Sequence, residues 1–524
     1  MKKTNVVFIL SDDHGQWAVG AYGNKEVKTP NLDRLANDGI LFNNFYCVSP
    51  VCSPARASIL TGKIPSQHGV HDWIGNGCVK KEDYENIKVS KKRYIASLGS
   101  ATNEDYHNVS DDEKVLYKKI SQYNFVKHEV KKPIQYLKDS VAYTELLRDN
   151  GYECGIVGKW HLGDSATPQK GFSFWSVIGK GGCIYHLPDF YRNGKLEVSD
   201  KYITDTITDE SISFIKNCVD KDTPFCININ YTAPHSPWIK EDQQEVVWNS
   251  YNDCKFESVK DEGIHPWQVD RRHPGFDNQE KRKYMLQGYY SAITSMDNNI
   301  GKLIEELENL NILEDTIIIF TSDNGMNLGQ HGIWGKGNGT FPMNFYDSSI
   351  KVPTIIYKKS SSKKGGVNNN MYSHYDFFPT ILDWCDVDYN LDSSYPGKSF
   401  ASILDSNDDK EDNVLVVFDE YGPNRMIRND RFKLIHRYPY GPHELYDLQN
   451  DTNEEINLYD DSKYKDIIIE LEKSLTTWFA KYTNKEVDGL SLGVNGNGQF
   501  CEVGCRSDGK NPFKGSFHLD FDTM

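Results

Sequence analysis

The sequence has no run of about 18 apolar residues, the length that a membrane-spanning helix requires, so we expect no membrane association. The first apolar run, Val6–Leu10, is too short for the core of a signal peptide. These two features predict a cytoplasmic protein, or a periplasmic or secreted one if a leader has been removed.

Basic residues are in the minority. The chain has 59 Lys and Arg against 75 Asp and Glu, which gives a formal net charge of −16. Nucleic-acid binding needs a basic surface, so we expect no nucleic-acid partner. A local cluster of Lys, Arg and His can nevertheless bind an anionic substrate against the overall charge.

Paired cysteine motifs and internal repeats are missing too. The eleven cysteines are odd in number and lack a Cys-x-x-Cys repeat, which argues against a zinc ribbon or a full disulfide framework. Cys501 and Cys505 are close enough in sequence either to form a disulfide or to stay reduced. The bias toward Lys, Asn, Asp and Ile is typical of a low-GC bacterium.

A chain of 524 residues with 38% hydrophobic content predicts a packed protein with one large and one smaller domain. Residues 1–411 read as an α/β domain with a large, mixed but mostly parallel sheet between helices. Residues 412–524 read as a smaller subdomain with a short-stranded antiparallel sheet, an amphipathic helix and a Gly-rich tail. Residues 79–130 and 240–285 read as polar insertions that shape substrate access, and Lys359–Asn370 as a mobile loop by composition.

Polar side chains follow directly on several apolar runs of strand length. These pairs are Asn5–Leu10 with Asp12 and Asp13, Gly151–Gly158 with Lys159 and His161, Phe225–Asn230 with His235, and Thr316–Phe320 with Asp323 and Asn324. In an open α/β sheet the ligand crevice lies outside the carboxyl ends of the strands, so we expect these groups to converge at one edge. Lys336 follows in the Gly-rich loop after the last of these strands.

Four of these residues carry oxygen ligands, namely Asp12, Asp13, Asp323 and Asn324. An all-oxygen set is the preference of a hard divalent cation rather than zinc. We therefore expect a site for Ca²⁺ or Mg²⁺, with Mn²⁺ also possible.

The stretch Pro50–Gly62 organises the rest of the chain. Pro54 suits the first position of a helix, with Ser53 as its N-cap and Gly62 as its end. Cys52 would then stand just before a helix N-terminus, which favours an anion, and Arg56 would lie about one turn into the helix.

The residues Cys-Ser-Pro-Ala-Arg-Ala-Ser-Ile-Leu-Thr-Gly at 52–62 resemble the signature of the type I sulfatases, which belong to the alkaline phosphatase superfamily. Gly-Tyr-Glu-Cys-Gly-Ile-Val-Gly-Lys-Trp-His at 151–161 resembles the second signature of that family. Leu445–Glu454 is similar to its C-terminal segment, with Thr452 where a Pro is usual. The resemblance extends from Asn5 to about Leu458 and implies an alkaline-phosphatase-like fold and sulfuric ester hydrolysis.

The resemblance also implies that a maturation enzyme converts Cys52 into formylglycine, whose hydrate supplies an oxygen ligand to the cation. One hydroxyl of residue 52 would attack the ester sulfur, with Asp323 accepting its proton. His235, together with Lys336, would protonate the leaving oxygen. The second hydroxyl would then release sulfate, a step that an ordinary Cys or Ser cannot perform. The charge on the sulfuryl oxygens would be offset by the cation, Arg56, Lys159, His161 and Lys336.

The expected substrate is a sulfated sugar of the glycosaminoglycan or mucin type, as a small molecule or an oligosaccharide, with aryl sulfates second. A phosphonate monoester or phosphodiester hydrolase of the same superfamily is the main alternative. A non-catalytic metal-binding or adhesion protein, in which Cys52 stays unmodified, is a third. The sequence does not define an oligomeric state.

Overall fold

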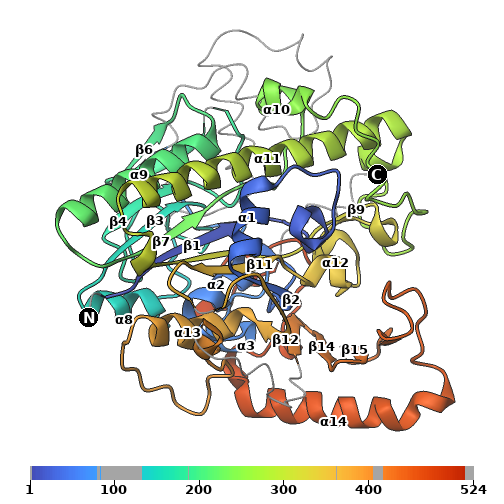
Figure 1. Ribbon diagram of the computed structural model, residues 1–524. Helices are drawn as coiled ribbons and strands as arrows, with labels where there is room; N and C mark the ends of the chain where they lie inside the picture. Colours follow the sequence, from blue (N-terminus) through green and yellow to red (C-terminus); the bar gives the residue numbers. More distant parts are fainter. Residues whose placement is uncertain are drawn as a thin grey trace.

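The computed structural model describes residues 3–79, 83, 133–186, 188–361, 363–404 and 417–513. A ten-stranded sheet forms the centre of the molecule, and a four-stranded antiparallel sheet forms a smaller C-terminal unit (Figure 1). The predicted fold class is confirmed. Nearly all of the expected insertion 79–130 and the expected boundary at 411/412 lie outside the described residues, so the domain division stays a prediction. No described helix is long and apolar enough to cross a membrane.

The central sheet has the strand order β12-β2-β11-β8-β1-β7-β3-β4-β5-β6. Strand β1 pairs in parallel with both β7 and β8, and β3 pairs in parallel with both β4 and β7. The antiparallel pairs involve β11 and the last two strands of the order, β5 and β6. The strands are β1 (Asn5–Ser11), β2 (Ile40–Tyr46), β3 (Glu153–Gly158), β4 (Phe174–Ile178), β5 (Asp189–Arg192), β6 (Lys195–Val198), β7 (Phe225–Asn230), β8 (Thr316–Ser322), β11 (Thr354–Lys358) and β12 (Gly366–Ser373).

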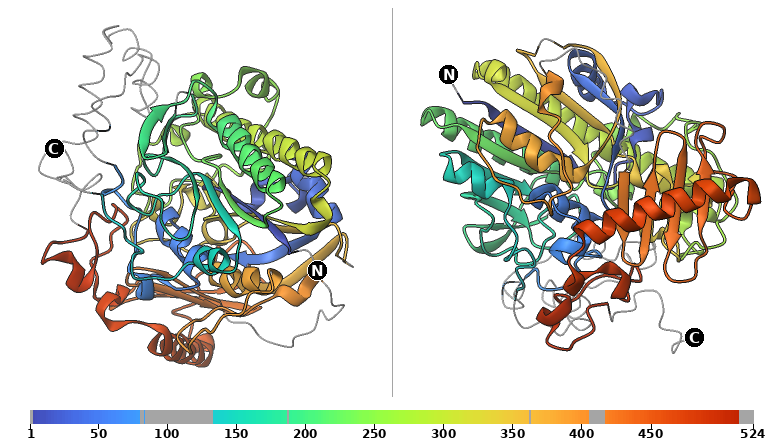
Figure 2. Two further views of the ribbon diagram at one scale, coloured as in Figure 1. Left: turned by 90° about the vertical axis from the view of Figure 1, so that its left-hand side faces the viewer. Right: turned by 90° about the horizontal axis from the view of Figure 1, so that it is seen from below.

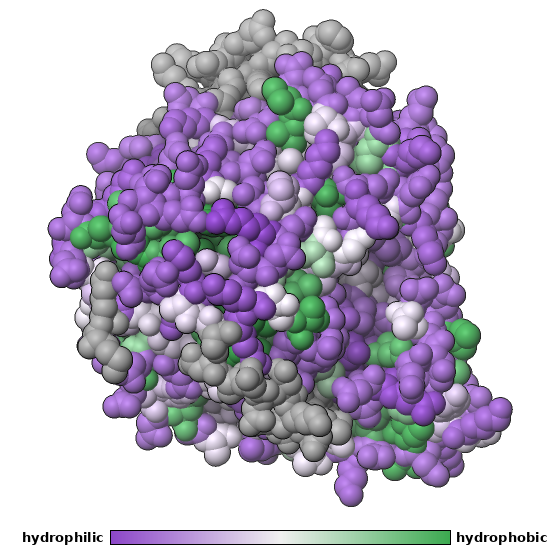
Figure 3. All heavy atoms as spheres, viewed as in Figure 1, coloured by the Kyte–Doolittle hydropathy of each residue, from purple (hydrophilic) through white to green (hydrophobic). Residues whose placement is uncertain are grey.

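Helices cover both faces of this sheet because alternate strand residues point to opposite sides. Val7 and Ile9 pack on the face covered by α1 (Pro30–Asp38), α9 (Ile203–Asp220) and α11 (Gln279–Asn309). Val6 and Phe8 pack on the face covered by α2 (Cys52–Thr61), α8 (Tyr143–Asp149) and α13 (Phe377–Trp384). Figure 2 shows the two layers from other directions. The outer face drawn in Figure 3 is mostly hydrophilic, with small scattered hydrophobic patches.

The C-terminal unit confirms the predicted antiparallel sheet and its covering helix. Its strands are β13 (Val417–Tyr421), β14 (Asn424–Arg428), β15 (Phe432–Arg437) and β16 (Glu444–Asp447), and α14 spans Lys465–Tyr482. Leu434 and Leu445 of the sheet share a core with Leu471 and Leu475 of the helix. Three short helices, α3 (Pro65–His68), α10 (Glu245–Asn249) and α12 (Asp347–Ile350), lie in the segments between these elements.

The prediction of a mobile loop over Lys359–Asn370 is wrong for its second half. Residues 366–370 belong to β12, and Val367 and Asn368 pair with Leu41 and Phe42 of β2. The strand lies at the edge of the sheet, where alternate side chains face solvent, so its polar composition resembles that of a loop. The Gly-rich loop after β8 likewise contains a two-stranded ribbon, β9 (Asn327–Leu328) and β10 (Trp334–Gly335).

The parallel register brings the polar strand ends to one level. Ser11 of β1 pairs with Ser322 of β8, and Leu10 pairs with Asn230 of β7. Asn230 in turn pairs with Gly158 of β3. The residues that follow these strands therefore emerge side by side at the carboxyl edge of the sheet, as expected.

Candidate active site

The predicted acidic residues meet at this edge. One carboxylate oxygen from each of Asp12, Asp13 and Asp323 and the sulfur of Cys52 all lie within 4.8 Å of one another, and all four residues are buried. Asn324 donates from Nδ2 to Asp13 Oδ1 over 2.8 Å. Its Oδ1 is buried and has no hydrogen-bond partner among the described residues. The four predicted oxygen-bearing residues are thus in one cluster.

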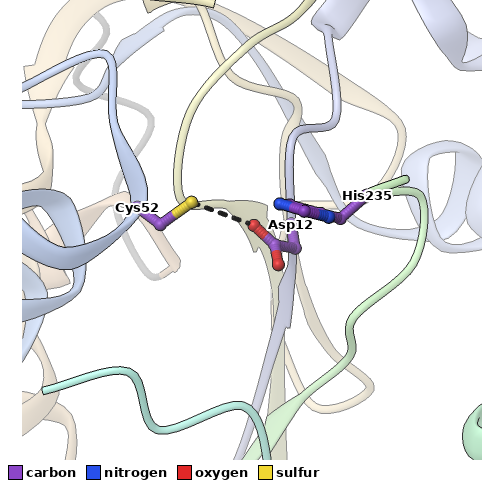
Figure 4. A group of neighbouring side chains, drawn as sticks. All are labelled: Asp12, Cys52 and His235. Carbon is purple, nitrogen blue, oxygen red and sulfur yellow. Dashed lines mark hydrogen bonds between the residues drawn. The ribbon is translucent and has the colours of Figure 1, made fainter. Parts of the chain in front are cut away.

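Cys52 points into this cluster from the start of α2. Its Sγ lies 3.4 Å from Asp12 Oδ1, 3.8 Å from Asp13 Oδ1 and 2.8 Å from Lys336 Nζ. Figure 4 shows Cys52 on one side of Asp12 and the His235 ring on the other. Asp12, Cys52 and His235 form a second group with potential ligand atoms within 4.8 Å of one another.

The predicted start of the helix needs a correction. Helix α2 begins at Cys52 with Val51 as its N-cap, so Cys52 is the first helical residue and Ser53 is not the cap. The Ser53 hydroxyl makes tertiary contacts instead. It donates to the carbonyl of His161 over 2.9 Å and accepts from the N–H of Ile74 over 3.0 Å. Those two partners lie in other segments of the chain, so the sequence around Ser53 could not show them.

Each carboxylate of the cluster has a cationic partner. Lys159 Nζ is 2.5 Å from Asp12 Oδ2, and Lys336 Nζ contacts Asp13 Oδ1. Arg56 reaches Asp323 Oδ2 with both Nε, at 2.9 Å, and Nη2, at 2.8 Å. Arg56 Nη1 also donates to the carbonyl of Lys159 over 3.0 Å. These cations are buried, so their charges act with little screening by water.

The two predicted histidines differ in exposure. His161 Nε2 lies 3.1 Å from the carbonyl oxygen of Ile74, whereas its buried Nδ1 has no partner among the described residues. His235 Nε2 is 3.7 Å from Asp13 Oδ2, and the His235 side chain is 24% exposed. Its Nδ1 lies 2.8 Å from the carbonyl oxygen of Ser236. His235 therefore stands where the cluster opens to solvent.

Burial and neighbouring charges shift the pKa values of the three carboxylates in different directions. Burial raises the pKa of Asp12, and the charge of Asp323 raises it further. Burial would also raise the pKa of Asp13, but the positive charge of Lys336 holds it well below its usual range. In the same way Arg56 outweighs burial and lowers the pKa of Asp323. Asp13 and Asp323 are therefore ionised at neutral pH.

The environment is unfavourable for a thiolate at position 52. Burial and the charge of Asp12 raise the pKa of the Cys52 thiol, so the sulfur stays protonated at neutral pH. A protonated thiol is a weak nucleophile. Burial, Lys159 and Arg56 together lower the pKa of His161 well below its usual range, so its imidazole is neutral.

Gly181 and Gly182 lie close to His161 and His235, and they were not predicted from the sequence. A Cβ built on Gly181 would stand 2.0 Å from His161 Nε2, and one on Gly182 would stand 3.5 Å from His235 Cε1. The pair follows the apolar strand β4 within a Gly-Lys-Gly-Gly run. The rule that polar or Gly-rich turns after strands line the crevice could have identified it.

Comparison with known proteins defines the class. A sulfatase family model matches residues 4–111 and 118–387, and a model described as "N-sulphoglucosamine sulphohydrolase, C-terminal" matches residues 329–481. The chain therefore belongs to the sulfatase family, and it is a sulfuric ester hydrolase.

Individual relatives extend along nearly the whole chain. An N-acetylglucosamine-6-O-sulfatase of Bacteroides thetaiotaomicron is 27% identical over 93% of this chain and 88% of its own. An arylsulfatase of Clostridium perfringens is 27% identical, with 94% and 97% of the two chains covered. A solved structure in complex with its substrate D-glucosamine-2-N,6-O-disulfate is 25% identical and covers 92% of this chain and 98% of its own, with a TM-score of 0.69.

Proposed function

We propose that the protein hydrolyses sulfate monoesters of carbohydrates with formylglycine at residue 52 and a bound Ca²⁺ ion. The observation that carries the proposal is the cluster of Asp12, Asp13, Asp323 and Cys52 with three buried cationic partners. The carboxylates of this cluster can bind a divalent cation. The cationic side chains beside them can contact the negatively charged sulfate group of a substrate.

The residues fit a hard divalent cation. Carboxylate oxygens are available from Asp12, Asp13 and Asp323, and the buried Oδ1 of Asn324 has no other partner among the described residues. Ca²⁺ prefers such oxygens, and Mg²⁺ or Mn²⁺ could use the same set. The sulfur of Cys52 is the one poor ligand, and oxidation of residue 52 to a hydrated aldehyde would replace it with oxygen. When bound, the cation would act as a Lewis acid toward the sulfuryl oxygens.

The side chains around residue 52 have different roles in proton transfer and in stabilising the sulfuryl group. Asp323, ionised because of Arg56, accepts the proton of the attacking hydroxyl. Arg56, Lys159 and Lys336 hold the sulfuryl group and offset its growing negative charge, whereas the neutral His161 holds the hydroxyl groups of residue 52. The partly exposed His235 stands on the open side, where the leaving alcohol departs, and protonates its oxygen together with Lys336. A second hydroxyl at residue 52 would allow sulfate to be released.

A sulfated sugar of glycosaminoglycan or mucin type is the proposed substrate. It is supported by the relatives named for N-acetylglucosamine-6-O-sulfatase and N-acetylgalactosamine-6-sulfatase activities. The loop that carries Lys336 continues to Phe341, whose side chain is 54% exposed and whose N–H donates to the Trp267 carbonyl. An exposed aromatic ring five residues after Lys336 is suited to contact a sugar.

The test compares three ester classes on protein matured by a formylglycine-generating enzyme. We expect kcat/KM for a 6-O-sulfated N-acetylhexosamine to exceed that for an aryl sulfate, and both to exceed that for an aryl phosphonate. A preference for the aryl sulfate would contradict the sugar assignment. A strong preference for the phosphonate would contradict sulfate-ester hydrolysis itself.

A further inference from the structure

Residues 487–499, which follow α14, lie against the loop formed by residues 69–75. His71 Nε2 is 2.8 Å from the carbonyl oxygen of Val487, and Trp73 Nε1 donates to the carbonyl of Gly496 over 3.1 Å. The N–H of Gly498 donates to Asp72 over 3.0 Å. Both family matches end before this segment, at residues 387 and 481. The family comparison therefore gives it no role.

Gln499 is the centre of this contact. It is 0% exposed, and its Oε1 accepts from the N–H of His71 over 2.8 Å. Its Nε2 donates to the carbonyls of Gly69, at 3.0 Å, and Cys501, at 3.1 Å. Its backbone N–H donates to the carbonyl of Trp73 and its carbonyl accepts from the N–H of Gly75, over 2.8 and 2.9 Å. The backbone of Gln499 thus holds the residues on either side of Ile74, and its side chain holds Gly69 and His71 earlier in the same loop.

Ile74 connects this loop to the active site through Ser53 and His161. Its N–H donates to the Ser53 hydroxyl over 3.0 Å, and its carbonyl lies 3.1 Å from His161 Nε2. Ser53 closes the ring by donating to the carbonyl of His161 over 2.9 Å. Ser53 neighbours Cys52 in the chain, so the closed ring of contacts joins residue 52, the 69–75 loop and His161.

The Ile74 carbonyl decides which nitrogen of His161 carries the proton. A neutral imidazole has one N–H and one lone pair, and a carbonyl can only accept. The proton is therefore on Nε2, and Nδ1 keeps its lone pair. Nδ1 has no partner among the described residues, so its lone pair stays available to accept a hydrogen bond.

We propose that Gln499 is a positioning residue of the active site, because it holds the Ile74 carbonyl where it fixes the orientation and tautomer of His161. The inference deepens the proposed function and rests on it, since it assumes that His161 contacts a hydroxyl group of residue 52. Gln499 itself touches neither.

The test variant is Gln499→Met, which keeps the shape of the side chain but removes its three hydrogen bonds. The matched control is Asp139→Asn, which removes a different contact of the same segment, the exposed 2.9 Å ion pair of Asp139 with Arg506. In matured protein we expect kcat/KM for an aryl sulfate to fall about 10–100-fold in Gln499→Met. In the control we expect it to change less than about twofold.

The second readout is the tautomer of His161, measured by long-range ¹H–¹⁵N spectra of histidine-labelled protein that retains the Cys52 thiol. The His161 signals are assigned by their loss in His161→Gln. Wild type should show a single form protonated at Nε2, and Gln499→Met should show a mixture. A merely structural role would lower stability without moving these signals.

Unchanged His161 signals in folded Gln499→Met, or a kcat/KM equal to that of the control, would overturn the inference. If Gln499→Met does not fold, Gln499→Glu keeps the His71 contact, loses the two donated bonds and is judged by the same criteria. Should matured wild type hydrolyse no sulfate ester, the proposed function fails. The spectra of the unmatured protein would still confirm or refute the positioning of His161.

Discussion

Replacing Gly181 with Ala should disable the site by displacing His161. The added Cβ would stand 2.0 Å from His161 Nε2, whereas ordinary contacts begin near 3.4 Å, so ring and loop must separate by about 1.4 Å. The ring is held by the Ile74 carbonyl at 3.1 Å. On the loop side, the N–H groups of Tyr185 and His186 donate to the buried Asp242, which resists movement.

A misplacement of about 1 Å can cost about 100-fold in rate, which corresponds to about 2.7 kcal/mol of transition-state stabilisation. We therefore expect kcat/KM for an aryl sulfate to fall about 100-fold in Gly181→Ala. Gly182→Ala is the matched control, because its Cβ would meet His235 at an ordinary 3.5 Å. Equal activities of the two folded variants would refute the reasoning and show that the loop, not the ring, moves.

Two further predictions concern stability and the metal. Lys433 is fully buried, and its Nζ lies 2.9 Å from Asp347 Oδ1 and 2.5 Å from the buried Glu454 Oε1. Lys433→Met should lower the free energy of unfolding in urea by about 3 kcal/mol, because Glu454 loses this ion pair while Arg428 still contacts Asp347. An unchanged free energy of unfolding would contradict this prediction. Burial would raise the pKa of Asp347, but Lys433 and Arg428 hold it below its usual range. Its stabilisation is therefore complete above about pH 4 and lost as the pH falls further, and acid titrations should show a shallower loss in the variant. Chelation should abolish turnover and Ca²⁺ should restore it, whereas chelator-resistant activity would argue against the cation.

The sequence predicted the elements whose pattern is local. Strands β1 and β8 contain continuous apolar runs because both faces of a parallel sheet are covered by helices, and such runs are visible without a structure. Strand β12 was missed because an edge strand is polar on its open side, and β2 because two asparagines, Asn43 and Asn44, interrupt its apolar pattern. Their pairing partners lie more than 300 residues apart in the chain, which no local pattern records.

The residues of the site likewise fall into those that a local sequence pattern predicts and those that it does not. Asp12, Asp13, Asp323 and Lys159 follow strands whose register brings them together, so the strand-end rule was sufficient to group them. Further residues act through contacts between distant segments. Gly181 matters because its backbone passes against His161, and Gln499 because it holds a loop more than 400 residues earlier. Neither residue type indicates such a role by itself.

The most direct test of the central claim is the mass of the peptide that contains residue 52, taken from matured protein that hydrolyses sulfate esters. The account predicts a loss of about 18 Da relative to the thiol, as expected for formylglycine. It also predicts that activity rises in proportion to the modified fraction and is absent from Cys52→Ser that keeps its serine unmodified. Full activity with an unmodified thiol or serine at residue 52 would contradict it.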